Sequence, residues 1–475
     1  MAVLALAPIA AVVAGALAAL LLEAFLKKKA HEAAATAAVL SLFAAGLLVV
    51  RSWNLDLAYF GGRLSLDPLA LLLMAVFILV ATFVVLMSLG YAPRRDVNLG
   101  QLCGLLLLAT AGLMIMVSST DWLVVFLGLE VLSVASYALA GLERRDRASS
   151  EAAAKYFLMG SFAGAFLVFG LAILFGTSGR LEFAAIASSG PAPAALPLAA
   201  LAGLGLILTG LFFKIAVAPF HMWAPDVYEG SPTPVTVFLT IAPKAAGFTV
   251  LLRVLSPLIT GSGTAAVFGP AVSVVAALTM FTGNLAALRQ TRVKRMLAYS
   301  AIAHSGYLLL AVISGDGPGL VFYLIAYAFM NAGAFAVLAA FSPNGTPGAS
   351  LADVAGLGRR HPWLAACLSL FLLSLAGIPP TAGFLAKFYV FSEAVAKGHV
   401  LLVVAAVMAS LVSVAYYLKI VVAMYMQEPK SGLSIERGDP ALSLVIFLCL
   451  FGVLELGLWP GNLLTLIRQG LAGLF

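Results

Sequence analysis

Seven ionisable residues stand where this sequence is otherwise apolar, and their types suit proton transfer. They are Glu130, Lys155, Lys214, His221, Lys244, His304 and Lys387. Burial favours the neutral form of a lysine or a carboxyl group, while bringing the two together favours the charged form of both. A Glu–Lys pair whose separation changes could therefore switch a lysine between holding and releasing a proton. Histidine titrates near neutral pH, so water-bridged lysines and histidines predict a proton wire.

Three of the lysines lie beside prolines. The stretch "LFFKIAVAPFHMWAPDVYEGSPTPV", residues 211–235, places Lys214 before a run of prolines, and Lys244 follows Pro243. Lys387 follows the pair at 379–380 in "GIPPTAGFLAKFYVF". Prolines break helices and free backbone carbonyls, which at membrane depth is tolerated only inside protein or beside a water-filled cavity. We therefore expect two broken helices that make wet places for lysines.

Simpler explanations exist for several of these side chains. Glu130 could be a protonated acid bonded to a backbone carbonyl, and His304 could be a satisfied core histidine. Lys214 and Lys155 lie near span ends, from which a lysine can extend to the membrane surface. Lys244, about eleven residues into its span, is too deep to do so easily. Two further charges on unbroken spans, Lys419 and Glu455, are predicted to be structural.

The composition identifies the class of protein. Of the 475 residues, 63% are hydrophobic and 10% charged, against roughly 25% charged in soluble domains. Apolar runs of about 20 residues, long enough to cross a bilayer as a helix, recur along the whole chain. The first run is predicted to be a span rather than a signal peptide, because lysines 27–29 stand where a cleavage site would be expected. The sequence thus predicts an all-α, polytopic membrane protein forming one membrane domain, 1–475.

Apolar lengths and helix breakers predict about fourteen transmembrane helices. The predicted segments are 3–25, 33–50, 68–91, 100–118, 121–141, 151–176, 197–219, 233–256, 266–288, 293–313, 317–341, 362–396 (interrupted), 399–426 and 441–459.

Basic residues indicate the orientation of these segments. They gather on alternate connections, at 27–29, 94–95, 143–147, 289–295, 359–360 and 430–437. By the positive-inside rule that side is cytoplasmic, so both termini are predicted on the outer side. The net charge of +7 therefore encodes topology and gives no support for nucleic-acid binding.

A faint internal repeat is present. "SYALAG" at 136–141 resembles "GYLLLA" at 306–311, and "GAF" at 164–166 recurs at 333–335. The broken segments around Lys214 and Lys387 have nearly the same offset, about 170 residues. Two five-helix units of opposite orientation, the inverted repeats of transporters, would explain it. The predicted divisions are 1–99 (helices 1–3), 100–256 (first repeat), 266–426 (second repeat) and 441–475 (C-terminal helix).

The sequence offers no pattern for a cofactor. Cys103, Cys367 and Cys449 are scattered through apolar segments without a CxxC pair, which disfavours disulfide, zinc and iron–sulfur sites. Neither GxGxxG nor a P-loop pattern is present. The intramembrane histidines lack the paired spacing of haem ligands, which disfavours a cytochrome-type quinone-binding anchor. We expect no cofactor in this chain.

Four stretches resemble one family of membrane subunits. They are "AAAKYFLMGSFAGAFLVFGLAILFG", "FFKIAVAPFHMWAPDVYEGSPTPVTVFLTIAPKAAGF", "VKRMLAYSAIAHSGYLL" and "GIPPTAGFLAKFYVF". In the same order they resemble subunit N of the proton-translocating NADH:quinone oxidoreductase, respiratory complex I, the bacterial counterpart of mitochondrial subunit 2. The resemblance covers roughly residues 60–425.

This resemblance implies an antiporter-like fold with two inverted five-helix repeats, broken helices 7 and 12, and one proton channel. By matching motif it implies the following roles: Glu130 as the glutamate of helix 5, Lys214 as its partner on helix 7, Lys155 as the lysine that modulates the pair, Lys244 as the central lysine of helix 8, Lys387 as the exit-side lysine of helix 12, and His221 and His304 as polar connecting residues. Sister subunit M carries a glutamate at the helix-12 position, so Lys387 disfavours it. Subunit L carries a long lateral helix for which this chain is too short.

The resemblance also implies partners and a location. The chain would serve an H⁺-translocating enzyme in the bacterial plasma (inner) membrane without redox chemistry of its own. FMN, iron–sulfur clusters and quinone would belong to the rest of the complex. Partners would be the antiporter-like subunits M and L, the small subunits K, J, A and H, the peripheral arm indirectly, and lipid, with no nucleic acid. An antiporter subunit of a multi-subunit Na⁺/H⁺ exchanger shares the fold and lysines and remains the alternative. A purely structural scaffold is disfavoured by the cost of buried charges.

Overall fold

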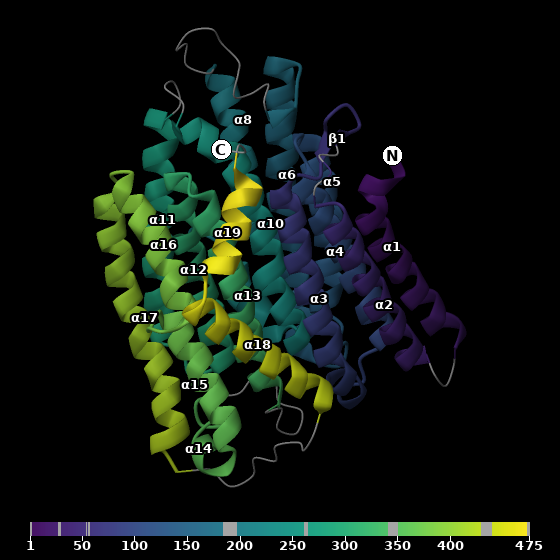
Figure 1. The fold of residues 1–475 in the computed structure, drawn as a ribbon, viewed down its shortest axis with the longest axis vertical. Helices are drawn as coiled ribbons and strands as arrows, with labels where there is room; N and C mark the ends of the chain where they lie inside the picture. The colour runs from purple at the N-terminus through teal and green to yellow at the C-terminus, as the bar shows by residue number, and fades with distance from the viewer. Residues whose placement is uncertain are drawn as a thin grey trace.

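The computed structural model describes residues 2–26, 30–53, 55, 58–183, 197–260, 265–340, 350–428 and 439–472. These residues are mostly helical, and most of the helices stand side by side in one bundle (Figure 1). A small hairpin pairs β1 (Ala58–Tyr59) antiparallel with β2 (Leu64–Ser65). The predicted all-α membrane fold is confirmed.

Twelve helices of the described residues are long and apolar enough to span a membrane. They are α1 (Ala2–Phe25), α2 (Ala30–Arg51), α3 (Pro68–Arg94), α4 (Leu99–Ser118), α5 (Trp122–Ala140), α6 (Arg147–Ser178), α10 (Thr233–Thr260), α11 (Ala265–Leu288), α12 (Val293–Ser314), α13 (Gly317–Ala340), α17 (Val400–Met426) and α18 (Pro440–Leu458). Each coincides with one of the predicted segments to within a few residues.

The two remaining predicted segments are interrupted helices. The first comprises α8 (Leu198–Lys214) and α9 (Trp223–Gly230), and the second α15 (Pro362–Ala376) and α16 (Ala382–Ala396). Both breaks contain the prolines that the sequence places there. The number of fourteen crossings stays a prediction. Two short helices complete the described chain, α14 (Leu357–Arg360) and α19 (Gly461–Leu471).

Short polar side chains begin several of the long helices. Asp67, Asn98, Asp121 and Asp146 each accept a hydrogen bond from a backbone N–H in the first turn of α3, α4, α5 and α6 respectively. Such caps satisfy donors that the helix itself leaves unpaired. Helix boundaries were therefore readable from local sequence.

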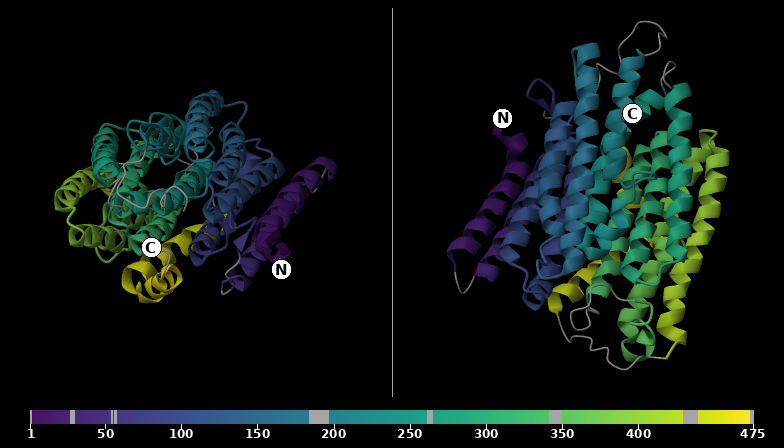
Figure 2. Two further views of the ribbon diagram at one scale, coloured as in Figure 1. Left: turned by 90° about the horizontal axis from the view of Figure 1, so that it is seen from above. Right: turned by 180° about the vertical axis from the view of Figure 1, so that it is seen from behind.

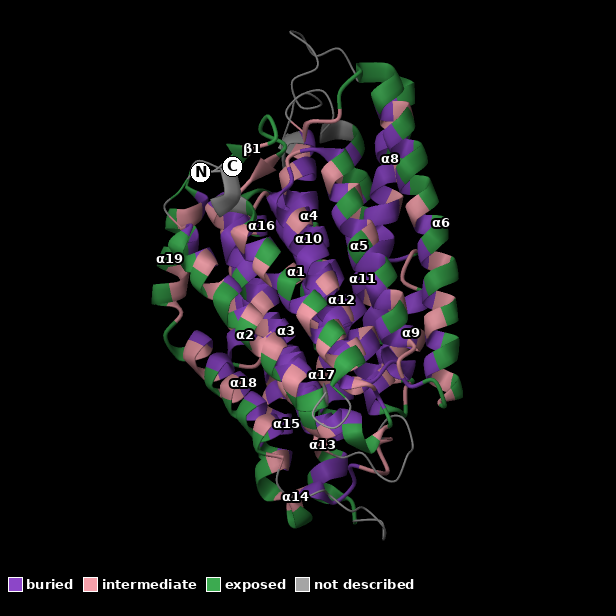
Figure 3. Ribbon diagram, turned by 90° about the vertical axis from the view of Figure 1, so that its right-hand side faces the viewer, coloured by how far each residue is buried: buried purple, intermediate pink, exposed green. Residues whose placement is uncertain are grey.

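The helices are ordered across the bundle, with α1 and α2 at one edge and α17 at the opposite edge (Figure 2). Helix α18 crosses obliquely, and α19 runs back along the bundle (Figure 1). Outer helices are buried on one face only, whereas inner helices are buried nearly all round (Figure 3). The described ends of the chain, near residues 2 and 472, lie toward the same end of the bundle.

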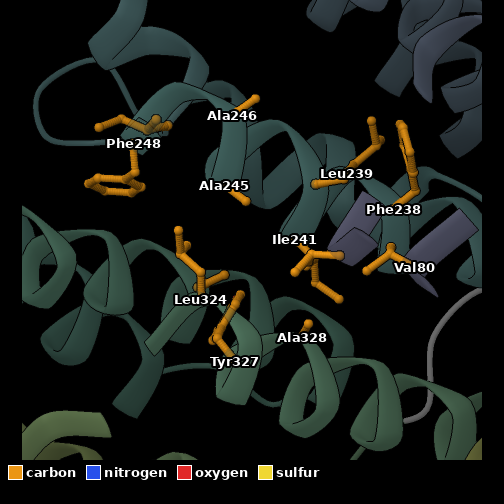
Figure 4. Packing of buried hydrophobic residues seen from close by; sticks show 14 of the residues in the cluster. Val80, Phe238, Leu239, Ile241, Ala245, Ala246, Phe248, Leu324, Tyr327 and Ala328 are labelled. Atoms are coloured by element: carbon orange, nitrogen blue, oxygen red, sulfur yellow. The ribbon is translucent and has the colours of Figure 1, made fainter. Parts of the chain in front are cut away.

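Helix α10 lies at the centre of the molecule. Every residue of its most apolar window is buried, as are nearly all residues in those of α12 and α13. Phe238 and Ile241 of α10 lie in the same apolar layer as Leu324 and Tyr327 of α13 (Figure 4). A lysine on such a helix has no route to water around the outside of the bundle.

The packing of helices fits the predicted repeats. In the range 100–256, α4 packs on α5, α6 packs on α8 and α9, and α10 contacts all of these but α6. In the range 266–426, α11 packs on α12, α13 packs on α15 and α16, and α17 contacts all of these but α13. The same pattern of neighbours occurs in both ranges and supports the division, which stays a prediction.

Candidate functional site

Lys214, the last residue of α8, points into the protein rather than to the membrane surface. Its side chain is buried, and its Nζ donates to Ser133 Oγ on α5 at 3.0 Å and to Tyr156 OH on α6 at 3.3 Å. The same Nζ lies 5.5 Å from the centre of the Tyr156 ring. Three helices thus hold this ammonium group, and extension to the surface does not describe it.

Glu130 lies one turn before Ser133 on α5 and is half-buried. It interacts electrostatically with Lys214, but among the described residues no ion pair within 4.0 Å joins the two. The Ser133 hydroxyl, three residues farther along the helix, shares the Glu130 face of α5 and contacts the lysine instead. The geometry is that of a separated pair whose distance can change.

Lys244 lies in the middle of α10 and is almost completely buried. Its Nζ donates to the Ala301 carbonyl and, at 2.9 Å, to Ser305 Oγ, both on α12. Ser305 Oγ in turn donates to the carbonyl of Ile215 at 2.7 Å. Ile215 directly follows Lys214 in the break after α8, so Ser305 links the backbone at the break to the central lysine.

The break after α8 is satisfied by groups from neighbouring elements. Besides the Ile215 carbonyl, the Phe213 carbonyl accepts from Trp223 Nε1 at 3.0 Å, and Ala218 N donates to Thr279 Oγ1 at 3.0 Å. Irregular backbone surrounded by protein in this way is tolerated at membrane depth.

His304 lies next to Ser305 on α12 and is buried among tyrosines. Its Nδ1 is 2.7 Å from Tyr323 OH, and its Nε2 is 3.4 Å from Tyr417 OH. The Tyr417 hydroxyl also bonds Ser300 Oγ. Both ring nitrogens therefore have hydroxyl partners on different helices, α13 and α17, as a relay requires.

Lys387 of α16 bonds the free end of α15. Its Nζ donates to the carbonyls of Leu375 (3.1 Å) and Ala376 (2.8 Å) and to Ser410 Oγ on α17 (2.8 Å). These carbonyls belong to the last turn of a helix and have no intrahelical partner. The lysine, with three donors and three acceptors, is fully satisfied in its charged form.

A pocket of about 420 Å³ opens beside Lys387 between α16 and α17. Its lining is mostly apolar, with Ser392 and Ser410 as polar exceptions. It runs from Gly377 at the end of α15 to Val395 near the end of α16. The pocket gives this lysine a space that Lys214 and Lys244 do not line.

Lys155 lies outside this interior chain. Its Nζ contacts Asp226 Oδ2 at 2.6 Å and Glu151 Oε1 at 2.7 Å, and its side chain is 40% exposed. Asp226 also pairs with Arg295 of α12 at 2.7 Å, and Arg295 with Glu229 at 2.9 Å. Lys155 therefore tethers α6 to α9. The next residue, Tyr156, is the one that reaches Lys214.

His221 lies within the first break and is partly buried. Its Nδ1 is buried without a hydrogen-bond partner among the described residues. The structure therefore does not join His221 to the chain of contacts described above.

Several polar residues of the site were not anticipated from the sequence. They are Ser133, Tyr156, Asp226, Asn284, Tyr307, Ser305, Tyr323, Ser410, Tyr416 and Tyr417. One available signal was proximity, because Ser133, Tyr156 and Ser305 lie within three residues of a predicted site residue. The others come from helices distant in sequence and carried no such signal.

The arrangement can hold and pass protons. Three buried lysines are surrounded by hydroxyl and carbonyl acceptors, which stabilise an ammonium ion in an apolar interior. Hydroxyl groups between them both donate and accept, and can therefore relay a proton. No group of three or more His, Cys, Asp or Glu side chains suited to a metal ion occurs in the described part of the chain.

Sequence comparison gives a consistent set of relatives. Residues 119–413 match the family described as NADH:quinone oxidoreductase/Mrp antiporter, TM. NADH-quinone oxidoreductase subunit N of Trichlorobacter lovleyi is 40% identical over 458 residues, 95% of this chain and 93% of its own. Subunit N of Desulfovibrio desulfuricans is 43% identical over 463 residues, 90% of each chain.

Solved structures agree on the fold. A chain of respiratory complex I from Thermus thermophilus, solved with bound aureothin, superposes with a TM-score of 0.83 at 34% identity, covering 96% of this chain and 98% of that one. A chain of the Mrp complex from Dietzia superposes with a TM-score of 0.79 at 22% identity, covering 99% and 94%. The second likeness is one of fold alone.

Proposed function

This chain belongs to the subunit N family of the NADH-quinone oxidoreductases, and on that premise we propose that it moves protons across the membrane as part of such a complex. The enzyme as a whole would be an H⁺-translocating NADH:quinone oxidoreductase. FMN, iron–sulfur clusters and quinone would lie in its other subunits. Its neighbours would be the antiporter-like subunits and the small membrane-arm subunits.

The observation that carries the proposal is the line of buried lysines. Lys214, Lys244 and Lys387 lie on α8, α10 and α16, each at most 6% exposed. A buried charge in a membrane protein costs about 2.5–3.5 kcal/mol on insertion scales, so three of them within one interior indicate an ion pathway. The proton would enter from the Glu130–Lys214 pair, pass Lys244 and His304, and leave from Lys387.

The direction follows from the predicted topology. The basic connections would face the cytoplasm of a bacterial cell, and both termini would face outward. The two broken helices would then be inverted counterparts, with Lys214 near the cytoplasmic side and Lys387 toward the outer side. Lys155 would modulate the first lysine indirectly, through the tether between α6 and α9.

Substitution of Lys244 tests the proposal. In the intact complex reconstituted into vesicles, Lys244→Met should abolish most proton pumping, because methionine keeps the volume but cannot hold a proton. Lys419→Met is the matched control, since Lys419 lies exposed on α17 and donates to the Gln290 carbonyl. Pumping at the wild-type rate in the Lys244 variant would contradict the proposal.

The alternative, an antiporter subunit of a multi-subunit Na⁺/H⁺ exchanger, is less well supported. The exchanger neighbour shares the fold at 22% identity, whereas relatives named subunit N are 40% identical or more over nearly the whole chain. Pumping that required Na⁺ would favour the exchanger.

A further inference from the structure

Between His304 and Lys387 the structure holds a second set of polar groups. They are Asn284 on α11, Tyr307 on α12 and Tyr416 on α17, each at most 1% exposed. None carries a charge, and each would be costly to bury unless its polar atoms were bonded. A core that only had to pack could use apolar side chains here.

Asn284 joins the two tyrosines. Tyr416 OH donates to Asn284 Oδ1 at 3.1 Å, and Asn284 Nδ2 donates to Tyr307 OH at 2.9 Å. Nδ2 also donates to the Met280 carbonyl at 2.8 Å. A carbonyl can only accept, so this last bond fixes which end of the amide faces which tyrosine.

The fixed amide sets the direction of the hydroxyl groups around it. Tyr416 must donate to Oδ1, and Tyr307 must accept from Nδ2. The hydrogen of Tyr307 is then free to point elsewhere, and its hydroxyl interacts with Ser410. Ser410 Oγ accepts from Lys387 Nζ at 2.8 Å, and Nζ lies 5.1 Å from the centre of the Tyr307 ring.

At the other end the set reaches His304. The Tyr416 and Tyr417 rings are 4.4 Å apart, and Tyr417 OH lies 3.4 Å from His304 Nε2. Polar side chains therefore extend from His304 through α17, α11 and α12 back to the lysine on α16.

We propose that Asn284 is a positioning residue that orients the hydroxyl groups of Tyr307 and Ser410 so that Lys387 is loaded as an ammonium ion. This inference rests on the proposed function. When Lys387 takes up a proton it presents three N–H donors, to the carbonyls of Leu375 and Ala376 and to Ser410 Oγ.

The direction of Tyr307 decides how well Ser410 serves. With Tyr307 donating to it, Ser410 Oγ receives hydrogens from the tyrosine and the lysine and cannot donate to a neutral amine. The charged lysine is then the better partner. Asn284 itself carries no proton, because an amide N–H is not acidic enough to exchange one rapidly.

Proton pumping by the intact complex in vesicles tests the proposal. Asn284→Leu keeps the volume and removes both bonds to the tyrosines, and should slow pumping roughly fivefold, the effect of one average buried hydrogen bond. Tyr416→Phe should slow it by a similar factor. The double variant should be no slower than the slower single variant, because both disturb one connected set.

A matched control is Tyr228→Phe, which removes a buried hydroxyl that donates to the Leu239 carbonyl away from this set. It should pump at the wild-type rate. Tyr307→Phe, which leaves Asn284 in place, gives the same test if Asn284→Leu does not assemble. Wild-type pumping in the Asn284 or Tyr307 variants, or factors that multiply in the double variant, would overturn the proposal.

The proposed function is tested separately in the same assay by Lys387→Ala. If Lys387→Ala pumps normally, the lysine is not on the pathway and the proposed function fails at this residue. If Lys387→Ala is slow while Asn284→Leu is normal, only the positioning role of Asn284 is refuted.

Discussion

At the scale of the residue, the first lysine of the site is held by neutral partners. Lys214 bonds Ser133 and Tyr156, while Glu130 acts on it from beyond ion-pair distance. A contact pair would favour one charged state permanently, whereas a separated pair leaves both states accessible. Small changes in the spacing of α5 and α8 would then change the charge on the lysine.

We expect Glu130→Gln and Lys214→Met each to lower proton pumping and coupled quinone reduction roughly tenfold, corresponding to about 1.4 kcal/mol. A neutral partner no longer alters the free energy of the other residue's charge, so the switch is lost. Rates measured on reconstituted mutant complexes check this.

The matched control is Glu455→Gln, a partly buried glutamate on α18 outside the site. It should leave both rates unchanged. If Glu130→Gln pumped as fast as Glu455→Gln, the carboxylate would have only a structural role.

At the scale of the element, the two broken helices solve the same problem in different ways. The break after α8 is satisfied by Ser305, Trp223 and Thr279 from outside, which leaves Lys214 free to face α5 and α6. The break after α15 is satisfied by Lys387 itself. Moving the proton at Lys387 therefore also changes how the end of α15 is bonded.

Gly377 ends α15 in a left-handed conformation with φ of +90°, and a Cβ there would lie 3.0 Å from Lys387 Cδ. Gly377→Ala should therefore both strain the turn, by about 1–3 kcal/mol, and displace the lysine. We expect slower proton pumping from complexes that assemble.

Gly398→Ala separates strain from displacement. Gly398 has a φ of +87°, but a Cβ there would meet nothing within 4 Å. Measured in the same pumping assay, Gly398→Ala should be close to wild type. Equal loss in the two variants would show that strain alone, and not the position of Lys387, matters.

At the scale of the whole molecule, the protein is a bundle with a wet interior line and an apolar outside. Exposed Leu, Val and Phe side chains cover the outer faces of α2, α5, α6 and α17, where lipid or partner subunits would lie (Figure 3). The interior line crosses from α5 to α16 through α10 and α12. A conformational change in a neighbouring subunit could reach it only through the outer helices.

Isolation of the native membrane complex should yield this chain together with flavin and iron–sulfur proteins, and with bound quinone. This follows from the family to which the chain belongs, and cofactor analysis of the separated subunits checks it. Flavin or a cluster bound to this isolated polypeptide, or a complex without redox subunits, would contradict the prediction.

The sequence by itself determined the class, the helix boundaries and the two breaks. Hydropathy over about 20 residues, capping aspartates and prolines act locally, so their consequences could be read without knowing the fold. It also singled out Lys214, Lys244, His304 and Lys387, because a charged or titratable group in an apolar run is costly wherever the run lies.

Only the tertiary structure decided which polar groups meet. Neighbouring residues 155 and 156 point to different places, Lys155 to Asp226 at the surface and Tyr156 to Lys214 inside. Ser305 joins Lys244 to the break after α8 across 61 and 90 residues of sequence. Asn284, with no charge and no neighbouring motif, gains its position from α12 and α17. Such contacts depend on the packing of distant helices, and no local pattern of residues encodes them.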